Sequence, residues 1–238
     1  AYVTYNRKKL ISNRIYNLLS MKLPSYVEII IIDDCSKDGT YAELKKITKN
    51  TSIKIFKNKF NYGFSRNYYE AIKRSNGEYV IWVSDKDEFS IDGIKNFLDW
   101  SKDKKINVAV LNYKRNIKVK EDHKKIIRNN KTRLIKYNEL WKCSHGPGIV
   151  WKKRSLINFL KDWSFLNKNF ATFIKYYPNL ALLIRLLPKG KCYFYNGEIT
   201  FQAEYADFSH FMEKEDSYNF VKSRWQQHKD TLGMLDFY

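Results

Sequence analysis

Residues 28–40 read EIIIIDDCSKDGT, and this stretch decides the fold class. Its isoleucine run is β-branched and unbroken by polar residues, which is typical of a strand buried on both faces of a parallel sheet. Two carboxylates, Asp33 and Asp34, leave the end of that strand, and Ser36 or Asp38 can cap the helix that follows. The stretch taken alone fits a structural turn. The same geometry also lets Asp34 accept a hydrogen bond from a ligand while Asp38 caps the helix.

Strands and helices alternate on both sides of this stretch. Apolar residues at helical spacing predict helices at 10–19, 40–47, 64–76 and 91–100, and apolar runs predict strands at 27–32, 53–56, 79–83 and 107–112. Alternation at this spacing implies right-handed crossovers and a mainly parallel sheet. Because ligands bind beyond the carboxyl ends of such strands, the side chains that follow each strand are the first candidates for a site.

The second half of the chain is less regular. Residues 114–136 form its most basic stretch, and we expect a surface excursion or mobile loop there. After it we predict a turn, a strand, the start of a helix and an amphipathic helix that caps the sheet, at 145–148, 149–151, 155–160 and 208–228. We therefore divide one continuous domain into a half at 1–113 and a half at 114–238.

The composition permits a large core and leaves a strong positive charge. Of the 238 residues, 44% are apolar, and 44 Lys and Arg against 25 Asp and Glu give a formal net charge of +19. Such a charge points to nucleic acid, an anionic membrane face or a phosphorylated substrate as partner, unless it reflects a lysine-rich composition alone. Since there is no helix-turn-helix, zinc or RNP signature, we expect no nucleic-acid partner.

Cysteine use and hydropathy exclude two further classes. The three cysteines are an odd number without C-x-x-C spacing, which argues against a disulfide framework or a thiolate zinc site and fits a reducing compartment. The longest apolar stretch, 180–187, is interrupted by Arg185 and is shorter than the about 20 residues that a bilayer requires. No signal peptide is visible, so we expect a cytoplasmic protein.

Two further polar motifs follow a predicted strand or open a predicted helix. Asp85 and Asp87 stand one residue apart after the strand at 79–83, and such a pair can hold a hard divalent cation that takes its remaining ligands from a diphosphate. Lys86 between them favours the alternative of a solvated turn. Arg66 lies at a helix start, where its guanidinium can pair with phosphate oxygens, although a surface arginine is the simpler interpretation.

In this order the motifs resemble the family 2 glycosyltransferases with the GT-A fold. The matching segments are VTYNR, EIIIIDDCSKDGT, NYGFSRNYYEAIKRSNGEYVIWVSDKDE and, more loosely, HGPGIVWKKRSL, at 3–7, 28–40, 61–88 and 145–156. The resemblance implies a Rossmann-like α/β/α sandwich with a mainly parallel central sheet and a C-terminal aromatic and helical cap. The half at 1–113 would then bind a nucleotide-sugar donor, and the half at 114–238 would bind the acceptor.

The resemblance also implies roles for single residues. In such enzymes the turn after the first strand and the acidic pair after the second cradle the nucleoside, a basic side chain contacts the diphosphate or the base edge, and a D-x-D motif holds Mg²⁺ or Mn²⁺. The matching positions are Val3, Tyr5, Asp33 and Asp34 for the nucleoside, Arg66 and Asp85 for the rest of the donor, and Asp85 and Asp87 for the metal. Ser84 and Lys86 depart from the commonest D-x-D-D form, so either acid can be the direct ligand.

A general base is harder to assign. Inverting transfer needs a carboxylate or imidazole beside the acceptor hydroxyl. In the family this group is usually an acid about 20–30 residues past the basic residue and serine that end the last matching segment. Counting from Ser155 reaches 176–179, where no acid stands. His145 and Asp162 are the remaining candidates, each also explicable as a structural or surface residue, and the acidic pair at 215–216 lies too far along the chain.

The sequence therefore predicts an inverting glycosyltransferase. We expect it to move a sugar from a nucleotide diphosphate, with UDP favoured, to a glycan or lipid-linked acceptor in the synthesis of a surface polysaccharide or glycoconjugate. The basic stretch 114–136 and later aromatic residues would allow peripheral contact with the anionic inner face of the membrane. Two alternatives stay open: a non-catalytic scaffold with the same fold, because the usual base is absent, and, less favoured, a basic nucleic-acid-binding module.

Overall fold

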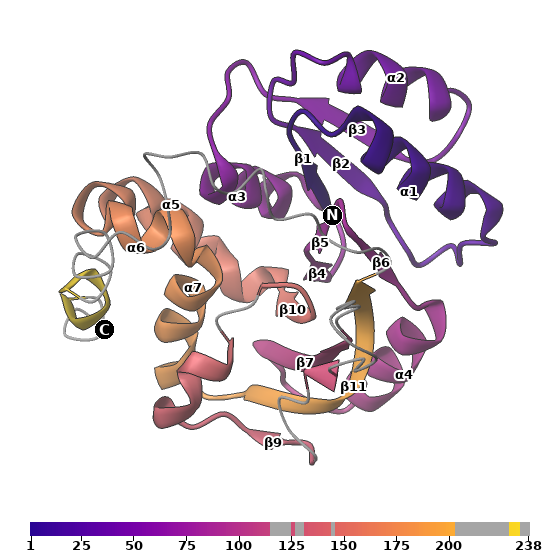
Figure 1. The fold of residues 1–238 in the computed structure, drawn as a ribbon. Helices are drawn as coiled ribbons and strands as arrows, with labels where there is room; N and C mark the ends of the chain where they lie inside the picture. The colour runs from indigo at the N-terminus through magenta and orange to yellow at the C-terminus, as the bar shows by residue number, and fades with distance from the viewer. Residues whose placement is uncertain (115–124, 127–130, 144–145, 203–228, 234–238) are drawn as a thin grey trace, which may run out of the picture.

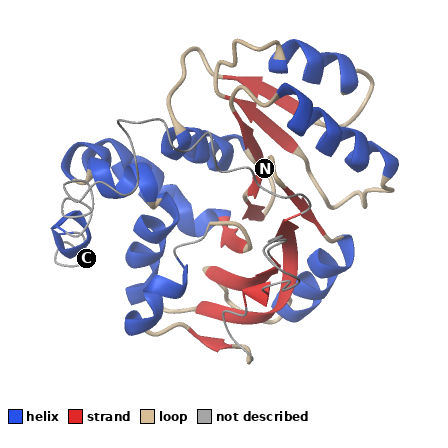
Figure 2. Ribbon diagram, in the orientation of Figure 1, coloured by secondary structure: helices blue, strands red, loops and turns tan. Residues whose placement is uncertain are grey.

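The computed structural model describes residues 1–114, 125–126, 131–143, 146–202 and 229–233 as an α/β fold with two adjoining sheets (Figure 1). Within these residues, sheet A has four strands and sheet B has seven. Helices lie outside the sheets (Figure 2), as the alternation of strand and helix in the sequence predicts. The α/β fold class expected from the sequence is therefore confirmed.

Sheet A is entirely parallel, and the isoleucine run lies in its middle. Its strands are, in spatial order, β3 (Lys54–Lys57), β2 (Ile30–Asp33), β1 (Tyr2–Thr4) and β5 (Val83–Ser84). The helices that pack on it are α1 (Lys8–Ser20), α2 (Thr40–Ile47) and α3 (Phe64–Arg74). Ile31 lies in one core with apolar residues of α1 and α2, and Ile32 lies in a second core with residues of α3. The run is thus buried on both faces, as predicted.

Sheet B is mixed, so the expectation of a mainly parallel sheet holds for sheet A alone. Its path runs through β4 (Tyr79–Ile81), β10 (Ile149–Lys152), β7 (Val108–Lys114), β11 (Cys192–Gln202) and β6 (Asp87–Phe89). β10 is antiparallel to both its neighbours, and β11 is parallel to β7 but antiparallel to β6. The described residues between β7 and β10 form short strands and a 3-10 turn rather than the crossover helix through which parallel strands are usually joined.

Part of the basic stretch 114–136 belongs to sheet B. β8 (Lys125–Ile126) pairs with β7, and β9 (Arg133–Leu134) pairs with β11. The expectation of a mobile loop is wrong for these residues, because their backbone groups are paired along existing strands. Residues 115–124 and 127–130 lie outside the described residues.

The predicted strand at 79–83 links the two sheets. It is interrupted at Trp82, so that β4 pairs in sheet B while β5 pairs with β1 in sheet A. The acidic segment that follows is not simply a turn, because Asp87 begins β6 and lies opposite Gln202 of β11. The segment 85–88 therefore lies where the two sheets meet (Figure 1).

Helices complete the core around sheet B. They are α4 (Ile91–Ser101), α5 (Lys153–Asn169), α6 (Ala171–Tyr176) and α7 (Pro178–Leu186), with 3-10 turns η1 (Tyr137–Cys143) and η2 (Leu187–Lys189). The apolar stretch 180–187 forms most of α7, whose residues are largely buried. Among the described helices, none is long and apolar enough to cross a membrane. The helix predicted at 208–228 lies outside the described residues.

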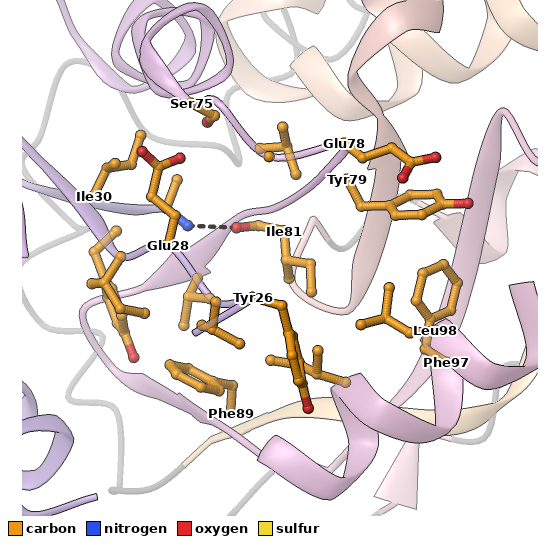
Figure 3. Close-up of a pocket in the computed structure, with 18 residues that line it drawn as sticks. Tyr26, Glu28, Ile30, Ser75, Glu78, Tyr79, Ile81, Phe89, Phe97 and Leu98 are labelled. Atoms are coloured by element: carbon orange, nitrogen blue, oxygen red, sulfur yellow. Dashed lines mark hydrogen bonds between the residues drawn. The ribbon is translucent and has the colours of Figure 1, made fainter. Parts of the chain in front are cut away.

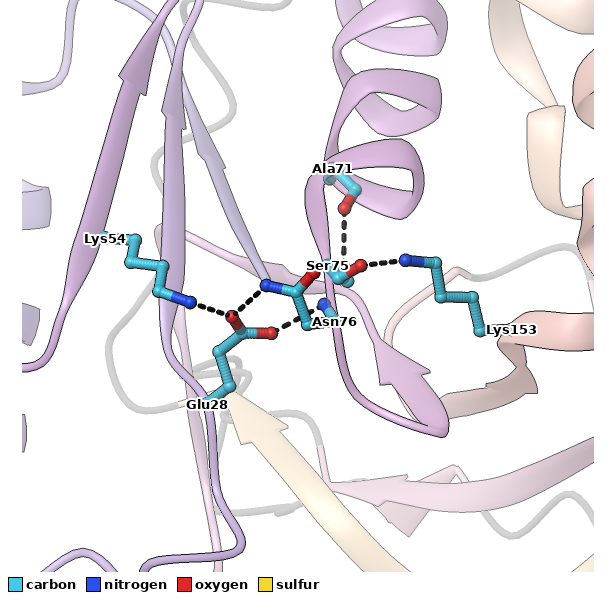
Figure 4. Close-up of polar contacts among 6 residues, drawn as sticks. All are labelled: Glu28, Lys54, Ala71, Ser75, Asn76 and Lys153. Atoms are coloured by element: carbon cyan, nitrogen blue, oxygen red, sulfur yellow. Dashed lines mark hydrogen bonds and ion pairs between the residues drawn. The ribbon is translucent and has the colours of Figure 1, made fainter.

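A polar cluster ties the amino edge of sheet A to the chain after α3 (Figure 4). Glu28 Oε1 accepts hydrogen bonds from Lys54 Nζ (2.7 Å) and Asn76 Nδ2 (3.0 Å), and Oε2 accepts one from the Asn76 backbone N–H (2.8 Å). Lys153 Nζ donates to the Ser75 carbonyl oxygen and so joins α5 to the same corner. Partial burial raises the pKa of Glu28, but the hydrogen bonds together outweigh this and lower it to about 2.

We predict that Glu28→Gln destabilises the fold at neutral pH by about 1 kcal/mol or less, since the cluster is partly exposed. The pKa of Glu28 is lower in the folded state than its ordinary value, so its stabilisation is present above about pH 4.5 and is lost as the pH falls through 2. Denaturant melts of wild type and variant should therefore differ at pH 7 and converge near pH 2. A constant difference across this range would contradict the assignment.

Candidate functional site

The carboxyl ends of three parallel strands meet at one edge of sheet A. Thr4 of β1 lies opposite Asp33 of β2, and Val3 lies opposite Ser84 of β5, so Asp34 and Asp85 follow neighbouring strands. The Asp34 backbone N–H donates to the Thr4 carbonyl oxygen at 2.9 Å. The structure thus brings Asp34 and Asp85 together at this edge, where the sequence analysis expected both. Val3 faces the core, whereas Tyr5 is 39% exposed.

The turns after β1 and β2 interlock. The Asn6 backbone N–H donates to Ser36 Oγ (2.8 Å), the Lys37 N–H donates to Asn6 Oδ1 (2.9 Å), and the Lys8 N–H donates to Asp38 Oδ2 (3.0 Å). Asp38 Oδ1 also accepts from the N–H of Thr40, the first residue of α2 (3.0 Å). Asp38 therefore helps to start two helices, and the two turns form one rigid base for the site.

The two adjacent aspartates after β2 have different surroundings. Asp33 is fully buried, and its Oδ2 accepts from the Ser36 N–H at 3.1 Å, so it shapes the turn. Asp34 Oδ1 accepts from Asn58 Nδ2 (2.7 Å) and the Tyr62 N–H (3.0 Å), and its Oδ2 accepts from the Gly63 N–H (2.8 Å). A carboxylate has about four acceptor positions, so one remains open on Asp34, which is 2% exposed.

The loop held by Asp34 presents aromatic and basic side chains to solvent. Arg66 is exposed, and its guanidinium lies 4.9 Å from the centre of the Tyr62 ring. The Phe60 ring meets Tyr62 edge-on at 6.3 Å, and Phe60 is 59% exposed. Gly63 has φ +79°, a left-handed conformation that favours glycine. Arg66 is therefore held at the start of α3 by a loop that Asp34 anchors.

Asp85 lies at the end of β5 and is 9% exposed. Thr4 Oγ1 and Ser84 Oγ approach its two oxygens at 3.5 and 3.3 Å. Burial raises the pKa of Asp85, and the positive charges of Arg7 and Lys86 oppose this rise. Arg7 is thus a neighbour of the site that the sequence reasoning did not single out, although it ends the quoted segment VTYNR.

Asp87 is more deeply buried, at 2% exposure, and is the first residue of β6 in sheet B. The Tyr113 hydroxyl donates to Asp87 Oδ1 at 2.5 Å. Burial raises the pKa of Asp87 to about 7, against the opposing effects of that hydrogen bond and of the nearby Ser84 backbone, and repulsion from Asp85 adds to the rise. In the part of the chain that the structure describes, Oδ2 has no hydrogen-bonding partner. Tyr113 is a second residue that the sequence reasoning missed.

These two carboxylates fit a hard divalent cation such as Mg²⁺ or Mn²⁺. Asp85 and Asp87 are close enough to repel each other, and Asp87 Oδ2 is a buried oxygen without a partner among the described residues. The described chain contains no group of three or more His, Cys, Asp or Glu that could hold a metal alone. A cation bound at this edge would take Asp85 and Asp87 as ligands and complete its shell with oxygens of a substrate diphosphate or of water.

Of the two candidates for the base, the structure describes only Asp162, which lies on a helix and not at the edge of sheet A. Asp162 lies on α5 and pairs with Arg185 of α7 (Oδ2 to Nη2, 2.7 Å), an ion pair within the helical layer. His145 and the acidic pair at 215–216 lie outside the described residues. At the position where an acid is usual, Asn179 donates to the Cys143 carbonyl oxygen at 2.6 Å and so has a structural role.

An apolar cavity lies at the opposite edge of sheet A. It has a volume of about 260 Å³ and is lined by Tyr26, Tyr79, Phe97 and other side chains near the amino ends of β1, β2 and β4 (Figure 3). The Ala1 amine donates to the Ile81 carbonyl oxygen in its wall at 2.7 Å. The acidic edge and this cavity are therefore separate features of the sheet.

The comparison with protein families matches residues 2–159 to glycosyl transferase family 2. The chain belongs to this family. The match covers the interlocked turns, the loop that Asp34 holds and the acidic segment 85–88, and it confirms the resemblance drawn from the motifs.

Two bacterial glycosyltransferases are among the relatives of this chain. The putative teichuronic acid biosynthesis glycosyltransferase TuaG of Bacillus subtilis is 27% identical over 100 residues, covering 41% of this chain and 38% of TuaG. The poly(ribitol-phosphate) beta-N-acetylglucosaminyltransferase TarS of Staphylococcus aureus is 29% identical over 97 residues, covering 39% of this chain and 17% of TarS. The matched region is thus well under half of either relative.

Solved structures of TarS residues 1–349 share the fold. The complex with UDP aligns with a TM-score of 0.66 at 16% identity, over 87% of this chain and 60% of that one. The complex with UDP-GlcNAc aligns with a TM-score of 0.63 at 17% identity, over 87% and 58%. At this identity the likeness establishes the GT-A fold.

We predict that Asp34→Asn lowers the free energy of unfolding by about 1–3 kcal/mol, because an amide NH₂ in place of one oxygen leaves a backbone N–H of the 58–63 loop without its acceptor. Urea denaturation at pH 7 measures the change. Asp99→Asn is the matched control, since Asp99 forms only a surface ion pair with Lys102 and is 51% exposed. An Asp34→Asn variant as stable as wild type would show that the loop does not depend on this carboxylate.

Proposed function

We propose that this chain is an inverting glycosyltransferase that moves a sugar from a UDP-linked donor to a glycan or lipid-linked acceptor in the synthesis of a surface polysaccharide or glycoconjugate. The observation that supports it most directly is the convergence of Asp34 and Asp85 at one strand edge, beside the loop that leads to Arg66, in a family 2 chain. UDP is favoured because TarS, whose fold this chain shares, has been solved with UDP and with UDP-GlcNAc.

The donor would bind across the carboxyl edge of sheet A. Asp34 has one acceptor position left for an N–H or hydroxyl of the nucleoside. Its backbone N–H is bonded to Thr4, so the exposed Tyr5, the next residue, lies beside it. Arg66 can pair with phosphate oxygens in a fork that lysine cannot reproduce. Arg7, whose charge reaches Asp85, adds a second cation on the other side of the site.

The transfer itself would be a single displacement. The acceptor hydroxyl oxygen attacks the anomeric carbon as the bond to the diphosphate breaks, UDP leaves with the electron pair, and a base takes the hydroxyl proton. A divalent cation on Asp85 and Asp87 would neutralise charge on the departing diphosphate. Hydrogen bonds hold the turns after β1 and β2 in place. The side chains on these turns would therefore bind the donor in one fixed orientation.

Peripheral contact with an anionic membrane face is part of the proposal. Within the described part of 114–136 and just beyond it, Leu134 and Tyr137 are 55% and 53% exposed, and the exposed Lys136 lies between them. Apolar side chains next to lysines suit an interface where acyl chains and anionic headgroups meet. The acceptor, if it is lipid-linked, would then be reached at the inner face of the membrane.

We predict that UDP raises the melting temperature of the protein, and that Mn²⁺ increases the shift, because a ligand that binds only the folded state stabilises it by mass action. Thermal-shift assays with nucleoside diphosphates and their sugars measure this.

Asp87→Asn should abolish the Mn²⁺ contribution and lower turnover by orders of magnitude, whereas Asp99→Asn should change neither. Stabilisation by no nucleotide would favour the scaffold alternative, and stabilisation by random DNA alone would favour a nucleic-acid-binding module.

We further predict a difference between the two candidates for the base. If His145 takes the proton, His145→Ala lowers the rate of transfer at least a hundredfold while UDP affinity is unchanged, since general-base catalysis contributes about 10²–10⁴-fold. Asp162→Asn should mainly lower stability, because it breaks the pair with Arg185. Steady-state kinetics with a UDP-sugar and denaturant melts separate the two effects. Full activity in either variant removes that residue from consideration.

A further inference from the structure

The strand arrangement brings one tyrosine, 26 residues after Asp87 in the chain, to the acidic segment. β11 lies between β7 and β6, pairing with the first in parallel and with the second antiparallel. Tyr113 of β7 therefore reaches past β11 to Asp87 at the start of β6, where its hydroxyl donates to Oδ1 at 2.5 Å. Neighbouring strands lie about 4.8 Å apart, so the contact spans two strand spacings and requires a long side chain with a terminal donor.

Both partners of this hydrogen bond are enclosed. Tyr113 and Asp87 are each 2% exposed. A hydrogen bond to one carboxylate oxygen in such a setting fixes the rotamer of the aspartate and hence the direction of the other oxygen. That other oxygen, Oδ2, is buried and has no partner among the described residues. Tyr113 thus binds Oδ1 of Asp87, and Oδ2 is left without a hydrogen-bond donor among the described residues.

We propose that Tyr113 is a positioning residue that orients Asp87 so that its Oδ2 ligates the divalent cation of the donor site. The inference rests on the proposed function, because it assumes that Asp87 holds the cation. Tyr113 acts through Asp87 and does not itself touch donor or metal. Hydrogen-bonding partners behind a metal ligand commonly contribute 10–100-fold to metal affinity, and Tyr113 is such a partner.

A second buried tyrosine gives a matched control. Tyr2 is 1% exposed, and its hydroxyl approaches the backbone carbonyl oxygen of Asp87, not the carboxylate, at 3.5 Å. Tyr2→Phe and Tyr113→Phe therefore remove the same atom from equally buried positions beside the same residue. Loss of packing or of a buried hydroxyl affects both variants, whereas only Tyr113→Phe frees the carboxylate.

The test is the affinity for Mn²⁺ in the presence of UDP, measured by electron paramagnetic resonance of free Mn²⁺, with denaturant melts to compare stability. We expect Tyr113→Phe to weaken Mn²⁺ binding by about tenfold or more. Tyr2→Phe should stay within about twofold of wild type, and the affinity for UDP without metal should be the same in all three proteins.

The outcomes separate this inference from the proposed function. Unchanged Mn²⁺ affinity in Tyr113→Phe, with clear binding in wild type, overturns the positioning role and leaves the metal site standing. Equal losses in both variants also overturn it, because they show a general effect of buried hydroxyls. A wild-type protein that binds UDP but no Mn²⁺ overturns the metal role of Asp87 and the positioning role of Tyr113 together.

Discussion

The hydrogen bonds of the Asp34 carboxylate hold together the turns at the carboxyl edge of sheet A. It accepts hydrogen bonds from Asn58 and from the backbone N–H groups of Tyr62 and Gly63, while its own N–H donates to Thr4. One residue thus joins the ends of β1, β2 and β3 to the start of α3. Backbone N–H groups at such a turn need acceptors, and a carboxylate is a stronger acceptor than a neutral group.

Burial of the acids beside it disfavours their ionised forms and so costs free energy. Asp85 and Asp87 are carboxylates whose pKa values burial raises, which means that their ionised forms are disfavoured in the folded chain. Arg7 and Lys86 offset part of the cost for Asp85, and a bound cation would offset more. The cost therefore favours binding of positive charge at this edge.

The sequence predicted what depends on local pattern and missed what depends on distant pairing. The isoleucine run and the acids after it were predictable, because parallel strands with crossover helices necessarily align their carboxyl ends. The strand that begins at Asp87 was not, because its partner is Gln202 of β11, far along the chain. Tyr113 was missed for the same reason, since no spacing rule relates it to Asp87. The base stays unassigned, because His145 lies outside the described residues.

The acidic segment is held from three directions, and this makes the site a property of the whole domain. Thr4 approaches Asp85 from sheet A, Arg14 of α1 pairs with Glu88 at 2.6 Å, and Tyr113 holds Asp87 from sheet B. The family match ends at residue 159, yet β11 at Cys192–Gln202 pairs with β6 and so fixes where Asp87 lies. Residues beyond the family match therefore help to place this acidic segment, and an intact sheet B is needed to hold Asp87 where it lies.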